Sequence, residues 1–239
     1  MKRKVKALAL LSGGLDSRLA IKLIQEQKVK VIALHFKLPF TGCCMPDCAF
    51  NFAQTEGIPL KIIDCTKGKL FYEYIKVIKN PKYGYGTALN PCIDCRIFML
   101  KKAKRLLKKF KADFIVTGEV LGERPLTQTK KAILFIEKKA GLQGKIVRPL
   151  SAKLLPATEV EKRGLINREQ FLDIQGRSRK KQITLARKYK ISYPNPAGGC
   201  SLCEKDFAAK LADLFQHQSK IGPEDIRLLK IGRHFRWNN

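Results

Sequence analysis

The side chains best suited to chemistry lie in a glycine-containing segment, SGGLDS, near the start of the chain. Gly13 and Gly14 let the backbone approach a phosphate closely. The stretch that follows has helical spacing, so its free N–H groups would point at the same place. Ser12 and Ser17 add hydroxyl donors, and Asp16 suits a Mg²⁺ ion or a role in shaping the loop. The segment predicts a phosphate site, with an ordinary capped glycine turn as the alternative.

A second reactive group is the cysteine pair in the segment NPCIDCR. Cys92 and Cys95 are three residues apart, which places both thiols on one face of a first helical turn. Asn90 is a good N-cap and Pro91 a good first helical residue. The helix dipole and Arg96 favour the thiolate form. The pair can chelate zinc, hold an iron–sulfur cluster or form a redox pair, with two structural thiols as the alternative.

Further thiols occur in the remote segment GGCSLC. Two glycines before Cys200 suit a tight turn that presents its sulfur. Cys92, Cys95 and Cys200 together would give three ligands, which leaves one iron of a cubane cluster open to an external sulfur ligand.

Three more cysteines, Cys43, Cys44 and Cys48, are close together after an expected strand. They suit a second metal, such as zinc with Asp47 or Cys65, or the relay of persulfide sulfur. Structural or locally oxidised thiols are the alternative. Cys65 stands at the end of another expected strand, where packing is the simpler role.

The elements that must position these residues alternate between strand and helix patterns over the first 150 residues. Such alternation predicts an α/β fold with a doubly wound parallel sheet, whose ligands bind at the carboxyl ends of the strands. We expect strands at 5–11, 29–36, 60–63 and 114–116, and helices at 15–27, 47–57 and 90–110.

The character of the chain changes near residue 150, where prolines punctuate an irregular basic stretch. We place a boundary there, and two short helical patterns follow at 207–215 and 225–229. The remainder is either a second domain or an extension that wraps the first.

Charge and composition restrict the partners. The 239 residues include 48 Lys and Arg against 20 Asp and Glu, a net charge of +28, which favours a polyanion such as nucleic acid. A generally basic thermophile proteome is the alternative. No apolar run approaches the ~18 residues of a membrane span. Eight cysteines without an export signal indicate a cytoplasmic protein with metal or redox sulfur chemistry.

The SGGLDS segment resembles the SGGxDS loop of the ATP pyrophosphatases, or PP-loop enzymes, which have a Rossmann-like HUP fold. These enzymes cleave ATP between its α- and β-phosphates and adenylate an oxygen of their substrate. The resemblance implies that residues 12–17 bind ATP and Mg²⁺, with Asp16 taking part in catalysis. His35 and Phe36 end the second strand, where the family holds adenosine. Thr117 and Gly118 end the fourth, where a TG pair lines the nucleotide.

Within a PP-loop protein, NPCIDC resembles the tRNA thiolation enzymes, notably thiouridine synthetases with a three-cysteine [4Fe–4S] cluster. The segments TGEVLGERPLTQ, RPLSAKLLP, DIQGRSRKKQ and PAGGC look like those of a short 4-thiouridine-synthetase-like subfamily. That subfamily is expected to lack the N-terminal RNA-binding module and the rhodanese domain of larger relatives. The resemblance implies that Cys92, Cys95 and Cys200 ligate the cluster. Cys203 is the less expected ligand, because the subfamily more usually has Thr there.

Basic residues offer candidate RNA contacts. The segment DIQGRSRKKQ contains turn residues and four cations that suit phosphates, namely Arg177, Arg179, Lys180 and Lys181. The tail at 233–237 mixes cations with aromatic rings that can stack on a base. A solvated basic face and a frayed terminus are the respective alternatives.

Together with these observations, the resemblance implies an ATP-dependent tRNA sulfurtransferase that adenylates a uridine carbonyl and replaces its oxygen with sulfur. In this interpretation residues 1–150 bind ATP, and a basic extension at 151–239 carries the third cluster cysteine. The sulfur donor is inorganic sulfide or a cysteine desulfurase, and a homodimer is left open. A PP-loop ligase or amidotransferase for a small molecule, and a metal-stapled RNA-binding module without catalysis, are the alternatives. The charge argues against the first, and the intact SGGLDS segment argues against the second.

Overall fold

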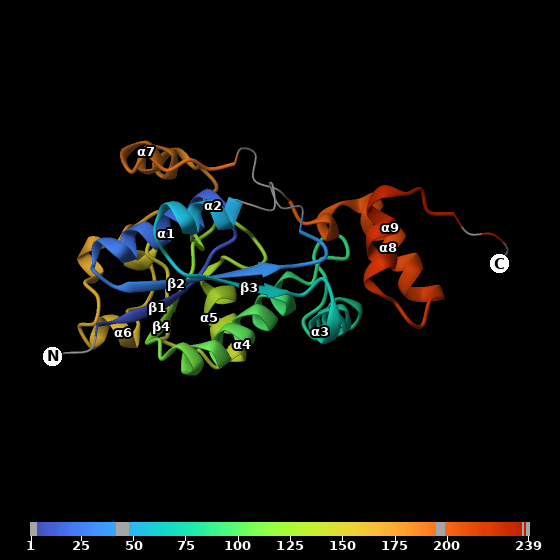
Figure 1. The fold of residues 1–239 in the computed structure, drawn as a ribbon, viewed down its shortest axis with the longest axis horizontal. Helices are drawn as coiled ribbons and strands as arrows, with labels where there is room; N and C mark the ends of the chain where they lie inside the picture. Colours follow the sequence, from blue (N-terminus) through green and yellow to red (C-terminus); the bar gives the residue numbers. More distant parts are fainter. Residues whose placement is uncertain (1–3, 42–47, 195–198, 236, 238–239) are drawn as a thin grey trace. The chain divides into compact units, whose positions relative to one another are not determined.

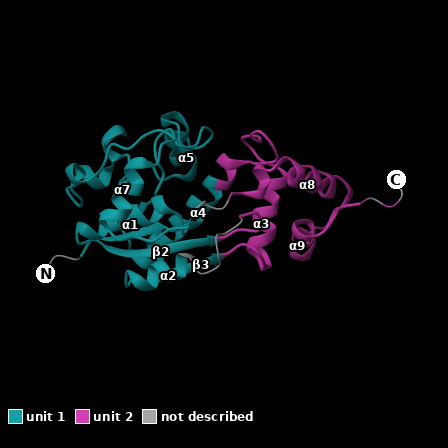
Figure 2. Ribbon diagram, turned by 90° about the horizontal axis from the view of Figure 1, so that it is seen from above, with its two compact units in different colours: residues 1–36, 44–63, 96–197 teal, residues 37–43, 64–95, 198–239 magenta. Residues whose placement is uncertain are grey.

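A computed structural model describes residues 4–41, 48–194, 199–235 and 237. The chain forms two compact units, coloured separately in Figure 2. Unit 1 comprises residues 1–36, 44–63 and 96–197, and unit 2 comprises residues 37–43, 64–95 and 198–239, in each case as far as they are described. Several segments distant in sequence therefore make up each unit.

A five-stranded sheet with the order β3-β2-β1-β4-β5 forms the centre of unit 1 (Figure 1). Strand β1 pairs in parallel with β2 and β4, and β4 pairs in parallel with β5. The central register aligns Ala7 with Val31 on one side and Phe114 on the other. The strands are β1 (Lys6–Leu10), β2 (Lys30–Lys37), β3 (Leu60–Asp64), β4 (Phe114–Val116) and β5 (Ile146–Val147).

Helices cover both faces of the sheet because its strands are apolar on both sides. In Figure 1, α1 (Leu15–Glu26) and α2 (Cys48–Thr55) lie on one face, and α4 (Cys92–Phe110) and α5 (Lys130–Ala140) lie on the other. Thr129 begins α5 by accepting a 3.2 Å hydrogen bond from the Ala132 N–H. Gly141, with φ of +64°, ends it in the left-handed region. The predicted doubly wound α/β fold is confirmed.

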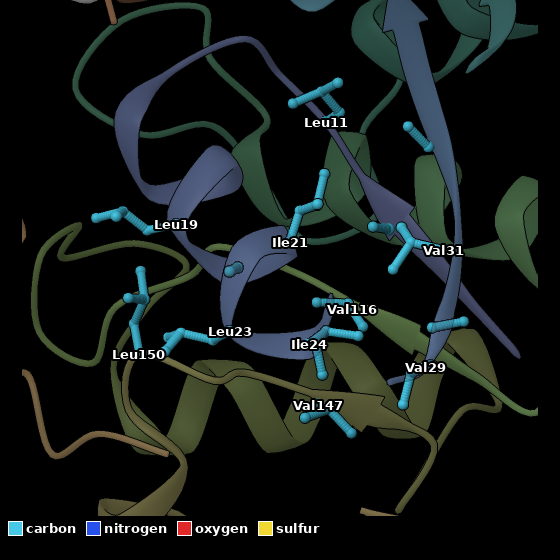
Figure 3. Packing of buried hydrophobic residues seen from close by; sticks show 14 of the residues in the cluster. Leu11, Leu19, Ile21, Leu23, Ile24, Val29, Val31, Val116, Val147 and Leu150 are labelled. Atoms are coloured by element: carbon cyan, nitrogen blue, oxygen red, sulfur yellow. The ribbon is translucent and has the colours of Figure 1, made fainter. Parts of the chain in front are cut away.

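The main apolar core lies between α1 and the sheet (Figure 3). Leu19 and Ile24 of α1 are fully buried and belong to the same apolar cluster as Val31 and Val116 of the strands. Burial of each such side chain stabilises the fold by about 1.5–3 kcal/mol. This core fixes the end of β1 and the start of α1, which enclose the SGGLDS segment.

The segment after β5 belongs to unit 1 as far as residue 194. The physical reason is burial, since Phe171, Ile174 and Ala186 lie in the same apolar core as β1 and α1. The segment holds η1 (Ala152–Leu154), α6 (Glu159–Lys162), η2 (Arg168–Gln170) and α7 (Lys180–Lys188), and α7 packs on α1.

Unit 2 has its own aromatic cluster. The ring of Phe40 lies 6.3 Å from that of Tyr74 and 6.0 Å from that of Phe207, measured between centroids. Thr41 forms an isolated antiparallel bridge with Cys200. The elements of unit 2 are α3 (Gly68–Lys79), the first turn of α4, η3 (Ser201–Cys203), α8 (Lys205–His217) and α9 (Pro223–Ile231).

The expected helices and the first four strands are confirmed to within a few residues. The sequence patterns missed α3, α5, α6, α7 and the two-residue β5. Helix α4 begins at Cys92, and the Asn90 side chain accepts a 3.0 Å hydrogen bond from the Ala88 N–H instead of capping the helix. Among the described helices, none combines the length and hydropathy needed to cross a membrane.

Candidate functional site

The SGGLDS segment forms a tight loop between β1 and α1. Gly13 has a φ of +89°, which a residue with a side chain rarely adopts. The Ser12 Oγ accepts a 3.3 Å hydrogen bond from the Gly14 N–H and lies 3.2 Å from the Ser17 Oγ. The Ser17 hydroxyl donates to the Gly14 carbonyl at 2.8 Å. The loop is therefore held by its own hydrogen bonds, with the first-turn N–H groups of α1 at its end.

Arg18 braces this loop from within the core. Its guanidinium Nε donates to the Gly13 carbonyl at 2.7 Å, and its Nη1 donates to the Ser192 carbonyl at 2.6 Å. The side chain is buried and also lies over the Phe52 ring. The chain after α7 is thus tied to the loop through one side chain.

Gly118 touches the loop backbone directly. A Cβ atom at this position would lie 2.5 Å from the Asp16 carbonyl carbon and 2.5 Å from the Ser17 nitrogen. Only glycine allows β4 to end so close to the SGGLDS segment. The adjacent Thr117 is buried, and its hydroxyl donates to Glu119 at 3.0 Å. The backbone at Gly118, not the Thr117 side chain, therefore faces the loop.

A buried ion-pair chain continues from Glu119. Arg96 Nε donates to one of its carboxylate oxygens at 2.7 Å, and Arg148 Nε donates to the other at 2.8 Å. Arg148 also pairs with Glu137. Burial would raise the pKa of Glu119, but the two guanidinium groups lower it to about 2. This chain anchors α4, immediately after Cys95, to the end of β4.

The other expected nucleotide residues lie at the end of β2. The His35 Nδ1 is 2.9 Å from the Leu11 carbonyl oxygen, so this ring is tied to the residue before the loop. His35 and Phe36 are both half-buried. Their position at a carboxyl strand end agrees with the expectation, while a nucleotide contact stays a prediction.

Asp16 points toward the segment that precedes α7. Its Oδ2 lies 3.8 Å from the Arg179 Nη2. Burial raises the pKa of Asp16, although Arg179 and Gln182 act to lower it. Arg179 therefore differs from the three other expected RNA contacts, Arg177, Lys180 and Lys181, whose side chains are exposed.

Unit 2 brings the remote cysteine segments near one another. Burial raises the pKa of the Cys200 thiol to about 12, and the thiols of Cys95, Cys203 and Cys92 add to this rise. The Cys95 Sγ lies 3.2 Å from the Tyr74 hydroxyl. The Asn90 side-chain amide donates to the Cys92 Sγ at 3.4 Å. The Cys200 segment, over a hundred residues away in sequence, thus lies within electrostatic reach of the pair on α4.

The described thiols do not have the spacing of ligands around one metal ion. Within the described part of the chain, no three His, Cys, Asp or Glu side chains have the spacing to hold one metal ion. Four neighbouring thiols are nevertheless the donor type that iron–sulfur clusters and zinc prefer. The donor set fits such a group, and its binding stays a proposal.

The structure describes only part of the second cysteine group. Cys43, Cys44 and Asp47 lie outside the described residues, and Cys48 is described only as the first residue of α2. Cys65 is fully buried, which confirms that it packs in a core.

Sequence reasoning did not assign a role to Glu119, Arg148 or Gln182. All three side chains are buried, and each lies at or next to the loop or its supporting strand end. Glu119 stood beside the TG pair, which was the available signal. Arg148 and Gln182 carried no signal, because burial of a charged or amide side chain is decided by packing.

A family model described as "Thiamine biosynthesis protein (ThiI)" matches residues 3–153. A tRNA-specific 2-thiouridylase MnmA of Cytophaga hutchinsonii is 33% identical over 134 residues, covering 49% of this chain and 35% of the relative. A probable tRNA sulfurtransferase of Finegoldia magna is 32% identical over 154 residues, covering 62% and 36%. The chain spans roughly a third of the length of these curated relatives.

One solved structure supports the fold. It is described as a 4-thiouridine synthetase–RNA complex with bound ATP. Its TM-score is 0.51 at 19% identity, over 95% of this chain and 52% of the other.

Proposed function

The chain belongs to the ThiI family, and we propose that it is an ATP-dependent tRNA sulfurtransferase. The observation that carries the proposal is the SGGLDS loop, already closed by its own hydrogen bonds and pressed against Gly118. The names of the relatives, a 2-thiouridylase and a probable tRNA sulfurtransferase, support tRNA as the substrate.

In the proposed nucleotide site, the loop backbone and the hydroxyls of Ser12 and Ser17 bind the phosphates. Asp16 stands at the same place as a ligand for the Mg²⁺ that accompanies ATP. His35 and Phe36 adjoin the adenosine, and Gly118 leaves room for the loop. The neighbour solved with bound ATP supports the choice of nucleotide.

The proposed reaction has two balanced steps. A uridine carbonyl oxygen forms a bond to the α-phosphorus, the bridging bond to the β-phosphate breaks, and pyrophosphate leaves with the electron pair. A sulfur nucleophile then forms a bond to the activated ring carbon, the C–O bond breaks, and AMP leaves. The chain's part is to position the reactants and stabilise the developing charge.

We assign the cysteines of unit 2 to the sulfur step. Cys92, Cys95 and Cys200 would hold a [4Fe–4S] cluster, with Cys203 as the less favoured ligand. When bound, that cluster would supply an open iron for a sulfur ligand. The sulfur comes from inorganic sulfide, or from the persulfide of a cysteine desulfurase with a thiol as the two-electron reductant that breaks its S–S bond. Cys43, Cys44 and Cys48 are proposed as a second, zinc-binding site. We place the reaction in the cytoplasm and leave a homodimer as one assembly to test.

Positive charge supports the RNA substrate. The net charge of +28 favours a polyanion. The exposed side chains of Arg177, Lys180 and Lys181 suit phosphate contacts. We propose that residues 1–150 bind ATP and that residues 151–239 supply RNA contacts and the third cluster cysteine.

The test is an anaerobic incubation with α-labelled ATP, Mg²⁺, sulfide and unmodified tRNA, followed by separation of the labelled products. AMP that forms only with tRNA, together with 2-thiouridine or 4-thiouridine in the digested RNA, supports the proposal and identifies the modified carbonyl. Asp16→Asn should abolish both products, whereas Arg163→Ala, at an exposed site in the same unit, should retain them.

Three results contradict this function. AMP formation without tRNA indicates a small-molecule substrate or idle hydrolysis. ADP as the product excludes attack at the α-phosphorus. The absence of any ATP turnover by protein with an intact cluster favours a non-catalytic RNA-binding module.

A further inference from the structure

The basic segment at residues 174–182 lies beside the SGGLDS loop. The Gly176 N–H donates to the Leu121 carbonyl at 2.7 Å, and Leu121 forms a parallel bridge with Gln175. Helix α7, which begins at Lys180, packs on α1, the helix that starts from the loop. The first turn of α7 is therefore a built part of unit 1 beside the loop.

Arg179 is the residue that reaches the loop from this segment. It precedes α7 as its N-cap residue, and its Nη2 lies 3.8 Å from the Asp16 Oδ2. That distance is too long for a hydrogen bond. Its Nε is buried and has no hydrogen-bond partner among the described residues. The guanidinium is thus held at the loop with part of its donor capacity unused.

Three further side-chain atoms at this place, in Asp16 and Gln182, make no hydrogen bond of normal geometry within the described residues. The Asp16 Oδ1 is buried without a hydrogen bond within the described residues. The Gln182 side chain is 0% exposed and lies near Asp16, yet neither atom of its amide makes a hydrogen bond of normal geometry. Buried polar groups almost always have partners, and leaving one unmet costs about 1–3 kcal/mol. Their convergence indicates a site built for a polar ligand.

The unmet groups specify the chemistry of that ligand. A guanidinium and an amide N–H₂ are donors, which phosphate oxygens satisfy. A carboxylate oxygen beside them suits a Mg²⁺ ion bound to the same phosphates. Glu123 lies within electrostatic reach of Asp16 and Arg179, and Arg124 lies within reach of both carboxylates. A magnesium-bound polyphosphate offers both the anion and the cation that these groups need.

We propose that Arg179 is a catalytic residue that contacts the β- and γ-phosphates of ATP, rather than an RNA contact, and that Gln182 assists it. The inference rests on the proposed function, because it assumes that the loop binds ATP. When the bridging bond between the α- and β-phosphates breaks, the electron pair moves to the departing pyrophosphate. The Arg179 guanidinium stabilises that charge through two donors in a fixed plane.

The decisive experiment compares two nucleotides in the absence of tRNA. Equilibrium binding of magnesium α,β-methylene-ATP and of AMP is measured for the wild type, Arg179→Ala and Arg179→Lys. Loss of charge-assisted hydrogen bonds should weaken binding of the ATP analogue by about 10- to 100-fold in Arg179→Ala. Binding of AMP, which has no β- or γ-phosphate, should stay within about twofold. Arg179→Lys should recover only part of the loss, because an ammonium lacks the planar fork.

Arg163→Ala is the matched control, since it removes the same charge from an exposed position in unit 1 and should change neither affinity. The tRNA affinity of Arg179→Ala should stay within about twofold of the wild type. Equal weakening of ATP analogue and AMP, no weakening of either, or a selective loss of tRNA binding overturns the inference. If Arg179→Ala unfolds, the same two affinities are compared for Arg179→Lys. A selective loss of affinity for the ATP analogue supports the inference, and an unchanged affinity overturns it.

Measured rates of AMP formation distinguish failure of this inference from failure of the proposed function. If the wild type makes AMP with tRNA and Arg179→Ala does so with an unchanged kcat/KM for ATP, the role of Arg179 is wrong while the function stands. If the wild type makes no AMP, the function fails, and the binding comparison still decides whether Arg179 contacts the outer phosphates.

Discussion

The SGGLDS loop and the cysteine group differ in how complete their internal geometry is. The SGGLDS loop in unit 1 has its hydrogen bonds in place and a glycine strand end pressed against it. The thiols in unit 2 lie within electrostatic reach of one another but lack the spacing of ligands around one ion. A phosphate site made of backbone is complete once its local structure forms. A thiol site made of remote segments would need a bound metal to complete its ligand geometry.

Removal of a proposed cluster ligand should have the largest effect on tRNA thiolation. It should also show that the cysteine group and the SGGLDS loop act in different steps. We expect Cys92→Ser, Cys95→Ser and Cys200→Ser each to lose at least about 10³-fold in tRNA thiolation, the scale seen when a member of a catalytic unit is removed. Affinity for ATP should stay unchanged, because the loop forms independently in unit 1. Mass spectrometry of digested tRNA and equilibrium ATP binding measure the two effects.

Cys203→Ser is the control for this series, since Cys203 is exposed and is the less favoured ligand. It should retain most of the thiolation activity and the iron content of the wild type. Normal thiolation by Cys95→Ser would refute the role assigned to the cysteines.

The substitution Gly118→Ala should have the reverse pattern of effects: it should lower ATP affinity and leave the cysteine group unchanged. The added Cβ would lie 2.5 Å from the backbone of Asp16 and Ser17, so the loop must shift. Such overpacking costs about 1–3 kcal/mol, and we expect ATP affinity in Gly118→Ala to fall by about 5- to 150-fold. Iron content per chain should not change. Gly222→Ala, whose Cβ meets only ordinary contacts, is the control and should bind ATP normally.

The ion pairs behind the loop should contribute to stability. Glu119→Gln removes the charge that faces the buried guanidinium groups of Arg96 and Arg148. Breaking such a pair costs about 3–5 kcal/mol, and chemical denaturation should show a loss of this size. Glu169→Gln, at an 80% exposed side chain that pairs with Lys153, should cost less than about 1 kcal/mol. Equal losses in the two variants would contradict the importance of burial.

Acid should weaken the same network. The pKa of Glu119 is about 2 in the folded chain, against an ordinary value of 4.5. Its stabilising contribution is therefore complete above pH 4.5 and is lost as the pH falls toward 2. Between these values the wild type should lose up to about 1.4 kcal/mol per pH unit more than Glu119→Gln. Parallel pH profiles for the two proteins would show that Glu119 is not the group that titrates.

The smallest effect is expected at the exposed cations of α7. Lys180→Ala with Lys181→Ala should weaken tRNA binding by several-fold at physiological salt. It should also reduce the slope of log affinity against log salt by up to about two, as for two phosphate contacts. Binding assays at several salt concentrations check this, with Arg163→Ala as the control. An unchanged slope would place the RNA elsewhere on the chain.

The two sites also differ in how far they could be predicted. The strand, loop and helix around SGGLDS are adjacent in sequence, and periodicity located them to within a few residues. Helix α7 was missed because its packing on α1, which lies over 150 residues earlier, accounts for its burial pattern. The two-residue β5 was missed because so short a strand has no periodicity of its own.

The sequence by itself determined the fold class, the place of the SGGLDS loop between β1 and α1, and the cysteine pair on α4, since each depends on residues close together in the chain. Tertiary structure alone decided that Arg179 faces Asp16 while Lys180 is exposed. It also decided that Glu119 lies between two guanidinium groups, and that Cys200 lies within electrostatic reach of Cys95 and Cys92. These placements depend on which distant segments share a core, and local spacing carries no record of that choice.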